Sequence, residues 1–142
     1  MIKIITGSRV TSRYTMITRM SSYPAPGPLP IPERKKVTIN SIRSLYKSKV
    51  KITMITAHDY PSAFFASKAK IDITLIGDSL AMVALGLDST NDVTMNEMIH
   101  HSKAVARGGD LAFRCGDMPF GSYEISPEWA LTNAIRYVKE VL

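Results

Sequence analysis

The sequence predicts an α/β fold in which parallel β-strands alternate with α-helices. From about residue 37, apolar residues at helical spacing alternate with short β-branched runs, in the order helix, β, α, β, α, β, α. Short connections in such a pattern imply parallel strands joined by right-handed crossovers. A complete (β/α)₈ TIM barrel takes roughly 250 residues. We therefore expect an incomplete barrel, with an N-terminal helix and about three βα units in residues 34–142.

Residues 1–22 have the composition of a mitochondrial transit peptide. The segment contains no Asp or Glu, and Arg9, Arg13 and Arg19 lie among Ser and Thr. A cationic amphipathic segment is attracted to the negative side of a membrane potential. The sequence thus predicts a mitochondrial location, with an untargeted tail as the alternative.

Residues 23–33 form the boundary between this leader and the folded body. Proline occupies every second position from Pro24 to Pro32, which fixes φ and removes every second backbone donor. An extended, polyproline-like linker is expected.

The first half of the body contains two expected helices and two strands. Thr38 caps a helix with Ile39, Ile42 and Leu45 on one face. A strand over 50–56 follows, and Asp59 with Pro61 marks the next helix start. The second expected strand spans 71–76.

The second half begins with a loop that contains Gly86 and Ser89. Thr94 and Glu97 form a capping box that starts a helix to about Arg107, and Gly108 and Gly109 end it. A third strand is expected over 111–115, and a last helix over 127–142.

The net charge of +6 is concentrated in the N-terminal part. Residues 1–50 contain ten basic residues and one acidic residue, a charge of +9, whereas the remainder carries −3. An acidic body argues against a phosphate-binding surface, so no nucleic-acid partner is expected. No apolar run of 18 residues predicts a membrane span, and stable membrane association is not expected. The lone Cys115 excludes an internal disulfide and is expected to be buried.

Polar residues follow each expected strand, at the end where parallel α/β folds place their reactive groups. These residues are Ala57-His58-Asp59, Gly77-Asp78-Ser79 and Gly116-Asp117-Met118-Pro119. Asp78 and Asp117 occupy equivalent positions, each after a glycine that allows close approach of a ligand. Two carboxylates at a strand mouth suit Mg²⁺. Helix caps or turns are the alternative for both.

The histidines do not predict a zinc site. His100 and His101 are adjacent and cannot both face one site on a helix, so we expect one to be packed and one solvated. His58, in the loop after the first strand, is a candidate polar contact.

Three runs in order resemble the ketopantoate hydroxymethyltransferase family over roughly residues 36–142. They are TAHDYPSAFFASKA, LIGDSLAMVALGLDSTNDVTMNEMIHHSKAVARG and GDMPFGSYEISPEWALTNA. The resemblance implies that Asp78 and Asp117 hold Mg²⁺ and contact substrate, and that Ser79 contacts the carboxylate of the 2-oxo acid. Arg114 departs from the apolar residue usual in the family, and the sequence leaves open whether its side chain reaches outward toward solvent.

The resemblance also implies a reaction, the first step of pantothenate biosynthesis. Its substrates are 3-methyl-2-oxobutanoate and 5,10-methylenetetrahydrofolate, and its product is 2-dehydropantoate. The family's third metal-side acid, its substrate-binding lysine and its general base are expected beyond Leu142, so this chain by itself is expected to be an inactive fragment. The intact family is implied to form homo-oligomers.

Two other interpretations stay open at this point. One is a Mg²⁺-dependent enzyme of the phosphoenolpyruvate mutase and isocitrate lyase group, which acts on other 2-oxo acids. The other is a non-enzymatic binding protein that uses the basic leader.

Overall fold

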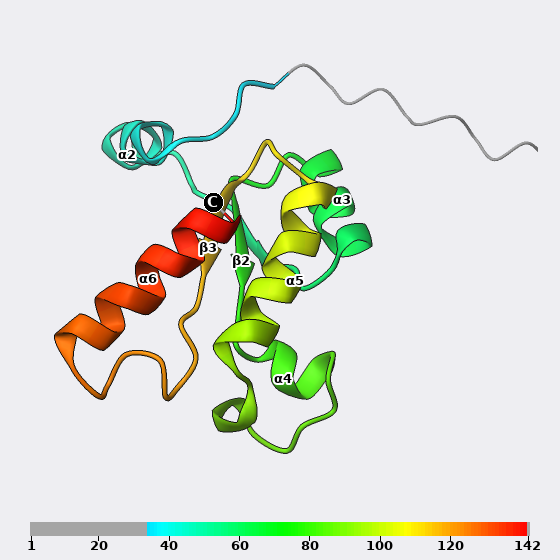
Figure 1. The fold of residues 1–142 in the computed structure, drawn as a ribbon. Coiled ribbons are helices and arrows are strands. Elements are labelled where there is room, and N and C mark those ends of the chain that lie inside the picture. Colours follow the sequence, from blue (N-terminus) through cyan, green and yellow to red (C-terminus); the bar gives the residue numbers. More distant parts are fainter. Residues whose placement is uncertain (1–33, 142) are drawn as a thin grey trace, which may run out of the picture. The chain divides into compact units, whose positions relative to one another are not determined.

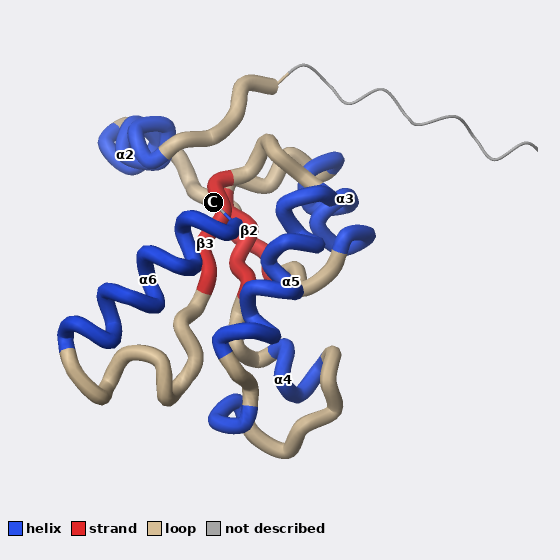
Figure 2. Tube along the Cα trace, in the orientation of Figure 1, coloured by secondary structure: helices blue, strands red, loops and turns tan. Residues whose placement is uncertain are grey.

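The computed structural model describes residues 34–141, which belong to a single compact unit. The predicted transit peptide and proline-rich linker lie outside the described residues. A three-stranded parallel sheet lies at the centre, with strand order β1-β2-β3. Figure 2 shows the sheet in red among the helices. The predicted α/β class, with parallel strands in chain order, is confirmed.

The elements follow the predicted order. The strands are β1 (Met54–Thr56), β2 (Ile73–Ile76) and β3 (Phe113–Gly116). The helices are α2 (Ile39–Lys47), α3 (Tyr60–Lys68), α4 (Leu80–Val83), the 3₁₀ helix η1 (Thr90–Asp92), α5 (Met95–Gly108) and α6 (Pro127–Val141). In the described part of the chain no helix is long and apolar enough to cross a bilayer.

Three of the four predicted helix starts have a capping box. The side chains of Thr38, Asp59 and Thr94 each accept a hydrogen bond from a backbone N–H three residues on. Each third residue, Ser41, Ser62 or Glu97, bonds back to the cap in turn, so all three are capping boxes. Hydrogen bonds from Ser62 hold the pKa of the Asp59 carboxyl below its usual value.

Strands β1 and β2 begin later than predicted, and a side chain takes one backbone hydrogen bond at their starts. Asp72, just before β2, accepts hydrogen bonds from the backbone N and the Oγ1 of Thr53, at 2.9 and 2.8 Å. Strand β1 therefore begins at Met54, although the carbonyl of Thr53 still accepts a hydrogen bond from the backbone N of Ile73 at 3.0 Å. The loop predicted after β2 contains α4 and η1, which are too short to produce a readable helical period.

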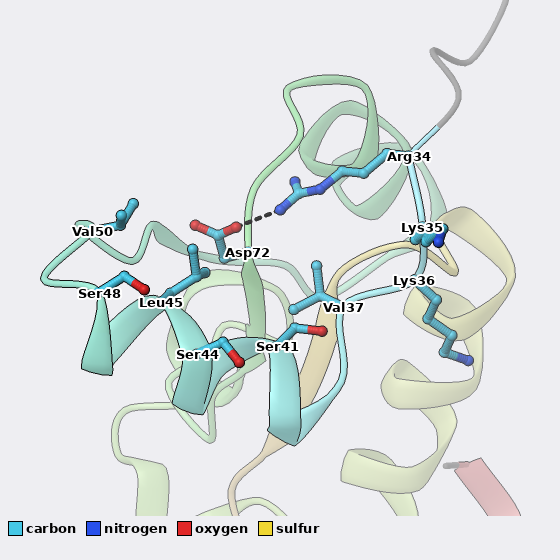
Figure 3. Close-up of a pocket in the computed structure, with 10 residues that line it drawn as sticks. All are labelled: Arg34, Lys35, Lys36, Val37, Ser41, Ser44, Leu45, Ser48, Val50 and Asp72. Carbon is cyan, nitrogen blue, oxygen red and sulfur yellow. Dashed lines mark hydrogen bonds and ion pairs between the residues drawn. The ribbon is translucent and has the colours of Figure 1, made fainter.

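Arg34 also binds Asp72, from the segment before α2. Its guanidinium pairs with the Asp72 carboxylate and donates to the backbone carbonyls of Lys70 and Ile71 (Figure 3). Burial opposes ionisation of Asp72, but the hydrogen bonds from Thr53 and Arg34 outweigh it and lower the pKa of this carboxyl. A pocket of about 550 Å³ lies here, between α2 and the residues that precede the strands. It is thus at the amino end of the sheet.

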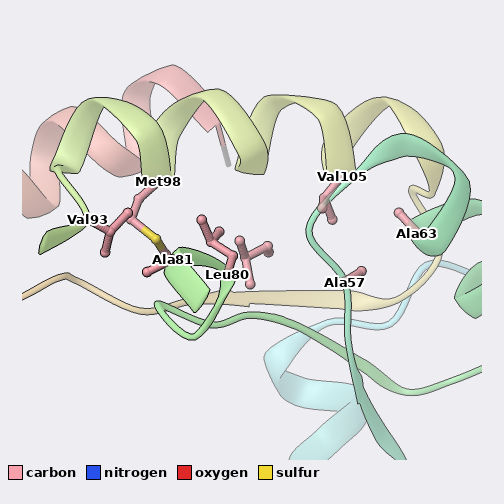
Figure 4. Close-up of a cluster of buried hydrophobic side chains, with 8 residues drawn as sticks. Ala57, Ala63, Leu80, Ala81, Val93, Met98 and Val105 are labelled. Carbon is pink, nitrogen blue, oxygen red and sulfur yellow. The ribbon is translucent and has the colours of Figure 1, made fainter. Parts of the chain in front are cut away.

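Helix α5 forms the main core with β2. Met98 and Val105 point from α5 toward the sheet and are at most 1% exposed (Figure 4). Met98 lies near Leu80, Ala81 and Val93 in the picture, at the carboxyl end of β2. Helix α5 also contacts both α3 and α6 (Figure 1). The three helices therefore pack in chain order over the sheet.

The opposite face of the sheet carries side chains that no described residue covers completely. Met54 is 60% exposed and Cys115 is exposed. On the same face, Leu75 of β2 is the register partner of Thr56 on β1 and of Cys115 on β3. The prediction that Cys115 is buried is wrong, because its strand position points it to this face. Arg114 alternates to the other face, where its side chain is only 11% exposed and lies 3.5 Å from the Asp110 carboxylate. The structure thus answers the question that the sequence left open, because the Arg114 side chain does not reach outward to solvent.

The exposed sheet face generates a prediction about residues 34–142 expressed alone. We expect an aggregated or molten chain, because burial of one large apolar side chain contributes about 1.5–3 kcal/mol and a whole domain is stable by only about 5–15 kcal/mol. Met54 on this face is 60% exposed, and Val50 and Ile55, which lie outside this face, are 52% and 47% exposed. Size-exclusion chromatography and near-UV circular dichroism test this. A monomer with a cooperative thermal transition would contradict it.

Candidate functional site

The loops after β2 and β3 meet at the carboxyl end of the sheet. The backbone N of Asp117 donates to the carbonyl of Ile76 at 3.0 Å, which continues the ladder past β3. The backbone N of Asp78 donates to Oδ2 of Asp117 at 3.3 Å. The Asp117 carboxylate therefore lies against the start of the Gly77-Asp78-Ser79 loop.

Ser79 lies at the same point. A Cβ added to Gly77 would lie 3.1 Å from Ser79 Oγ and 3.5 Å from Asp117 Oδ2. The missing side chain thus leaves a space bordered by a hydroxyl and a carboxylate. The structure brings Asp78, Ser79 and Asp117, the three predicted site residues, to one position.

Neither aspartate caps the helix that follows its own strand. Ser79 is the N-cap of α4 and makes no side-chain capping bond. Within residues 34–141 the Asp78 carboxylate has no hydrogen bond or ion pair, and the Asp117 carboxylate has no cationic partner. Two partly exposed carboxylates therefore lie at one sheet end without a neutralising protein charge.

The loop after β1 borders this site. Thr56, Ala57 and His58 line a small pocket of about 20 Å³ together with Gly77 and Ser79. The backbone carbonyl of His58 accepts a hydrogen bond from Nδ1 of His101 at 2.6 Å, so α5 holds this loop. A carbonyl oxygen can only accept a hydrogen bond, so Nδ1 of His101 carries a proton.

The histidines are arranged as the sequence predicted. His101 is partly buried against the His58 carbonyl, and His100 is exposed. Among the described residues no group of three or more His, Cys, Asp or Glu could hold a metal ion.

Tyr137 supports the site from α6, although no sequence pattern indicated this residue. Its hydroxyl lies 2.6 Å from Ser102 Oγ on α5, and both side chains are buried. Burial raises the pKa of the Tyr137 hydroxyl, although the Ser102 hydrogen bond opposes the shift, and the nearby charge of Asp117 adds to it. The phenol is therefore neutral at ordinary pH. Tyr137 thus connects α5 and α6 beside Gly116, the residue before Asp117.

Gly116 has a different role from the one predicted. A Cβ at this position would lie 2.2 Å from the Tyr137 hydroxyl oxygen and 2.6 Å from its ring carbons. The absence of a side chain accommodates the tyrosine ring rather than a ligand. A glycine before a strand-end aspartate does not by itself distinguish these two roles.

The fold and this site together define an α/β protein whose polar residues gather at the carboxyl ends of parallel strands, the usual place of an enzyme site in such folds. A family model described as ketopantoate hydroxymethyltransferase matches residues 36–142. The chain belongs to this family.

Curated relatives agree with the family match. A 3-methyl-2-oxobutanoate hydroxymethyltransferase of Emericella nidulans is 52% identical over 122 residues, which cover 86% of this chain and 35% of the relative. Enzymes of the same name from Ignicoccus hospitalis and Carboxydothermus hydrogenoformans are 54% and 52% identical over 105 residues. These alignments cover 74% of this chain and 40% and 38% of the relatives. The chain therefore spans well under half the length of these relatives.

The contact between Gly116 and Tyr137 generates a stability prediction. Gly116→Ala should destabilise the full-length protein by about 1–3 kcal/mol, because the added methyl overlaps a ring in a packed core. The cost should fall in a Tyr137→Ala background, where the ring is absent. Urea denaturation measures both values.

Lys139→Ala on α6 is the control, because Lys139 is exposed and takes no part in the contact between Gly116 and Tyr137. It should alter the free energy of unfolding by less than about 0.5 kcal/mol. An equal cost of Gly116→Ala with and without the Tyr137 ring would contradict the steric explanation.

Proposed function

We propose that the full-length protein transfers a hydroxymethyl group from 5,10-methylenetetrahydrofolate to 3-methyl-2-oxobutanoate, giving 2-dehydropantoate. The observation that carries the proposal is the pair Asp78 and Asp117 at adjoining strand ends, with no cationic partner among the described residues. Family membership supplies the reaction class and the 2-oxo acid.

The donor set fits part of a magnesium site. Mg²⁺ prefers oxygen ligands, commonly one or two carboxylates completed by water and substrate oxygens. Asp78 and Asp117 provide two carboxylates, and no third His, Cys, Asp or Glu joins them within residues 34–141. A bound Mg²⁺ would stabilise the negative charge that develops on the 2-oxo acid when its C3 proton is removed.

The proposal gives each of the three site residues, Asp78, Ser79 and Asp117, a part in the reaction. The two carboxylates would hold the cation, and the Asp78 backbone N–H donates to Asp117 Oδ2. Ser79 Oγ, exposed beside them, would donate to the carboxylate of 3-methyl-2-oxobutanoate. Because both carboxylates are assigned to the cation, the proposal assigns removal of the C3 proton to a residue other than these three.

The proposed whole fold is a (β/α)₈ barrel. Support comes from the strand order β1-β2-β3 and from α3, α5 and α6, which pack in chain order. A doubly wound sheet would instead place successive helices on both faces. Helix α6 carries three apolar side chains that are each 57–61% exposed, Leu131, Ile135 and Val138. In the proposed whole protein, further barrel elements or other subunits of a homo-oligomer would bury them.

The proposed location is the mitochondrion. It rests on the composition of residues 1–22, where three arginines occur without any acidic residue. The reaction proposed above does not depend on it.

The metal assignment predicts the effect of removing either charge. In the full-length protein, Asp78→Asn and Asp117→Asn should each lower Mg²⁺-dependent kcat/KM by about 10² or more, because each removes a charged ligand from a hard cation. Ser79→Ala should act mainly on KM for 3-methyl-2-oxobutanoate, since a neutral hydrogen bond contributes only about 0.5–1.5 kcal/mol.

Asp110→Asn is the matched control for these variants. Its carboxylate is 70% exposed, precedes β3 and pairs with Lys36 at 2.7 Å, at the other end of the strand. Steady-state kinetics should leave this variant close to wild type. Wild-type activity in both Asp78→Asn and Asp117→Asn would rule out the proposed metal site.

The location is tested with a fluorescent protein fused behind residues 1–35. We expect the fusion to enter mitochondria, because the membrane potential drives a positively charged leader inward. Replacement of Arg9, Arg13 and Arg19 by Gln should leave the fluorescence in the cytosol. Cytosolic fluorescence of the unmodified fusion would refute mitochondrial targeting.

A further inference from the structure

The loop after β1 borders the aspartate site, and only its first residue is bonded to the sheet. The backbone N of Ala57 donates to the carbonyl of Leu75 at 2.9 Å, which extends the ladder one residue past β1. The backbone N of His58 instead donates to Ser62 Oγ at 3.3 Å, in the first turn of α3. His58 therefore lies outside the hydrogen bonds of the sheet.

Helix α5 binds this loop through His101. Its Nδ1 donates to the His58 carbonyl at 2.6 Å, a short hydrogen bond. Within residues 34–141 this is the one hydrogen bond that joins His58 to an element other than α3. The two imidazole rings also meet edge to face, with their centroids 6.3 Å apart. The position of the loop relative to α5 thus depends on a single side chain.

The acidic groups near His101 do not compete for its Nδ1 proton. Asp59 Oδ1 accepts from the backbone N of Ser62 at 2.8 Å, and Glu97 Oε2 accepts from the backbone N of Thr94 at 2.7 Å. Hydrogen bonds from Ser62 and Thr94 are the main cause that lowers the pKa of each carboxyl, and the charge of His101 adds to both shifts. The neutral ring protonated on Nδ1 and the imidazolium both donate to the carbonyl, so the bond does not depend on the charge of His101.

The loop that His101 holds is a wall beside Ser79. Ala57 and His58 line a pocket with Gly77 and Ser79, and its volume of about 20 Å³ is little more than one water molecule needs. The loops after β1 and β2 are therefore close to one another. Ser79 Oγ makes no capping bond to α4, so the residues packed around it decide where this hydroxyl lies.

We propose that His101 is a positioning residue of this site, whose Nδ1–H acts through the His58 carbonyl to hold the loop after β1 against Ser79. The position of that loop sets the affinity of the site for the 2-oxo acid. The inference rests on the proposed function for the identity of the substrate and for the contact of Ser79 with its carboxylate. Loss of the bond would let the wall beside Ser79 move, which weakens substrate binding without removing either carboxylate.

Binding of 3-methyl-2-oxobutanoate to the full-length protein tests this role without catalysis. Calorimetric titration with Mg²⁺ present and the folate absent gives the Kd of the 2-oxo acid. His101→Leu removes the donor and should raise this Kd about three- to tenfold, the effect of one lost hydrogen bond. His101→Asn should keep the Kd within about twofold of wild type, because the Asn amide N can occupy the Nδ1 position and donate to the same carbonyl.

The adjacent histidine provides a matched control. His100 is exposed, contacts the His101 ring edge to face and has no hydrogen bond within residues 34–141. His100→Leu should therefore leave the Kd within about twofold of wild type. His101→Gln carries its amide N at the Nε2 position, away from the carbonyl, and should resemble His101→Leu. It keeps the comparison available if circular dichroism shows that the leucine variant does not fold.

Two further measurements distinguish positioning from a general loss of stability. Hydrogen exchange of the backbone amides of residues 57–62, without substrate, should be faster in His101→Leu than in wild type and in His101→Asn. In steady-state kinetics His101→Leu should raise KM for the 2-oxo acid and leave kcat within about twofold. A purely structural role would reduce the fraction of active protein, which lowers kcat and leaves KM unchanged.

Three results would overturn the role of His101 and leave the proposed function intact. They are a wild-type Kd in folded His101→Leu, an equal loss of affinity in His101→Asn and His101→Leu, and unchanged exchange of the loop in His101→Leu. Wild-type protein that binds the 2-oxo acid and shows these effects, but catalyses no transfer, refutes the proposed function alone. Wild-type protein that does not bind the 2-oxo acid refutes both.

Discussion

The packing of α5 on β2 is the contact on which the rest of the described structure depends. Ile76, Met98 and Val105 are almost completely buried, and the buried Leu80 and Val93 close the same cluster near the carboxyl end of the strand. The same helix contacts α3 on one side and α6 on the other. Because β2 is the central strand, the position of α5 over it also sets where the loops after β1, β2 and β3 begin relative to one another.

That alignment explains how residues far apart in the chain reach one site. Asp117 lies 39 positions from Asp78, and a single hydrogen bond from the Asp78 N–H to Asp117 Oδ2 joins the two loops. His101 and Ser102, adjacent on α5, reach in different directions: His101 holds the carbonyl of His58, and Ser102 holds the hydroxyl of Tyr137. Helix α5 thus supports the site from both the β1 side and the β3 side.

The two ends of the sheet have distinct chemistry. At the amino end, Asp72 is paired with Arg34 and bonded to Thr53, so its charge is used to hold the chain together. At the carboxyl end, Asp78 and Asp117 have no such partner within residues 34–141. Unpaired carboxylates contribute nothing evident to stability, which favours a ligand role for them.

Local signals in the sequence determined the helix starts, the order of elements and the parallel sheet. Thr38, Asp59 and Thr94 specify their caps through bonds to residues three positions away, so no distant partner is needed. Equivalent strand-end positions also indicated Asp78 and Asp117 together, because parallel strands align their carboxyl ends. Family-specific runs added the reaction class.

Only the tertiary structure decided contacts between distant segments. Exposure of Cys115 and burial of Arg114 depend on which sheet face the helices cover, a property that alternation along one strand leaves undetermined. Gly116 reads like Gly77 in sequence, yet Tyr137, 21 residues later, fills the space beside it. The amide of Asn133 on α6 is likewise held by the carbonyl of Ser122, in the loop before that helix. Such features arise from packing between elements, and no local pattern encodes the partner.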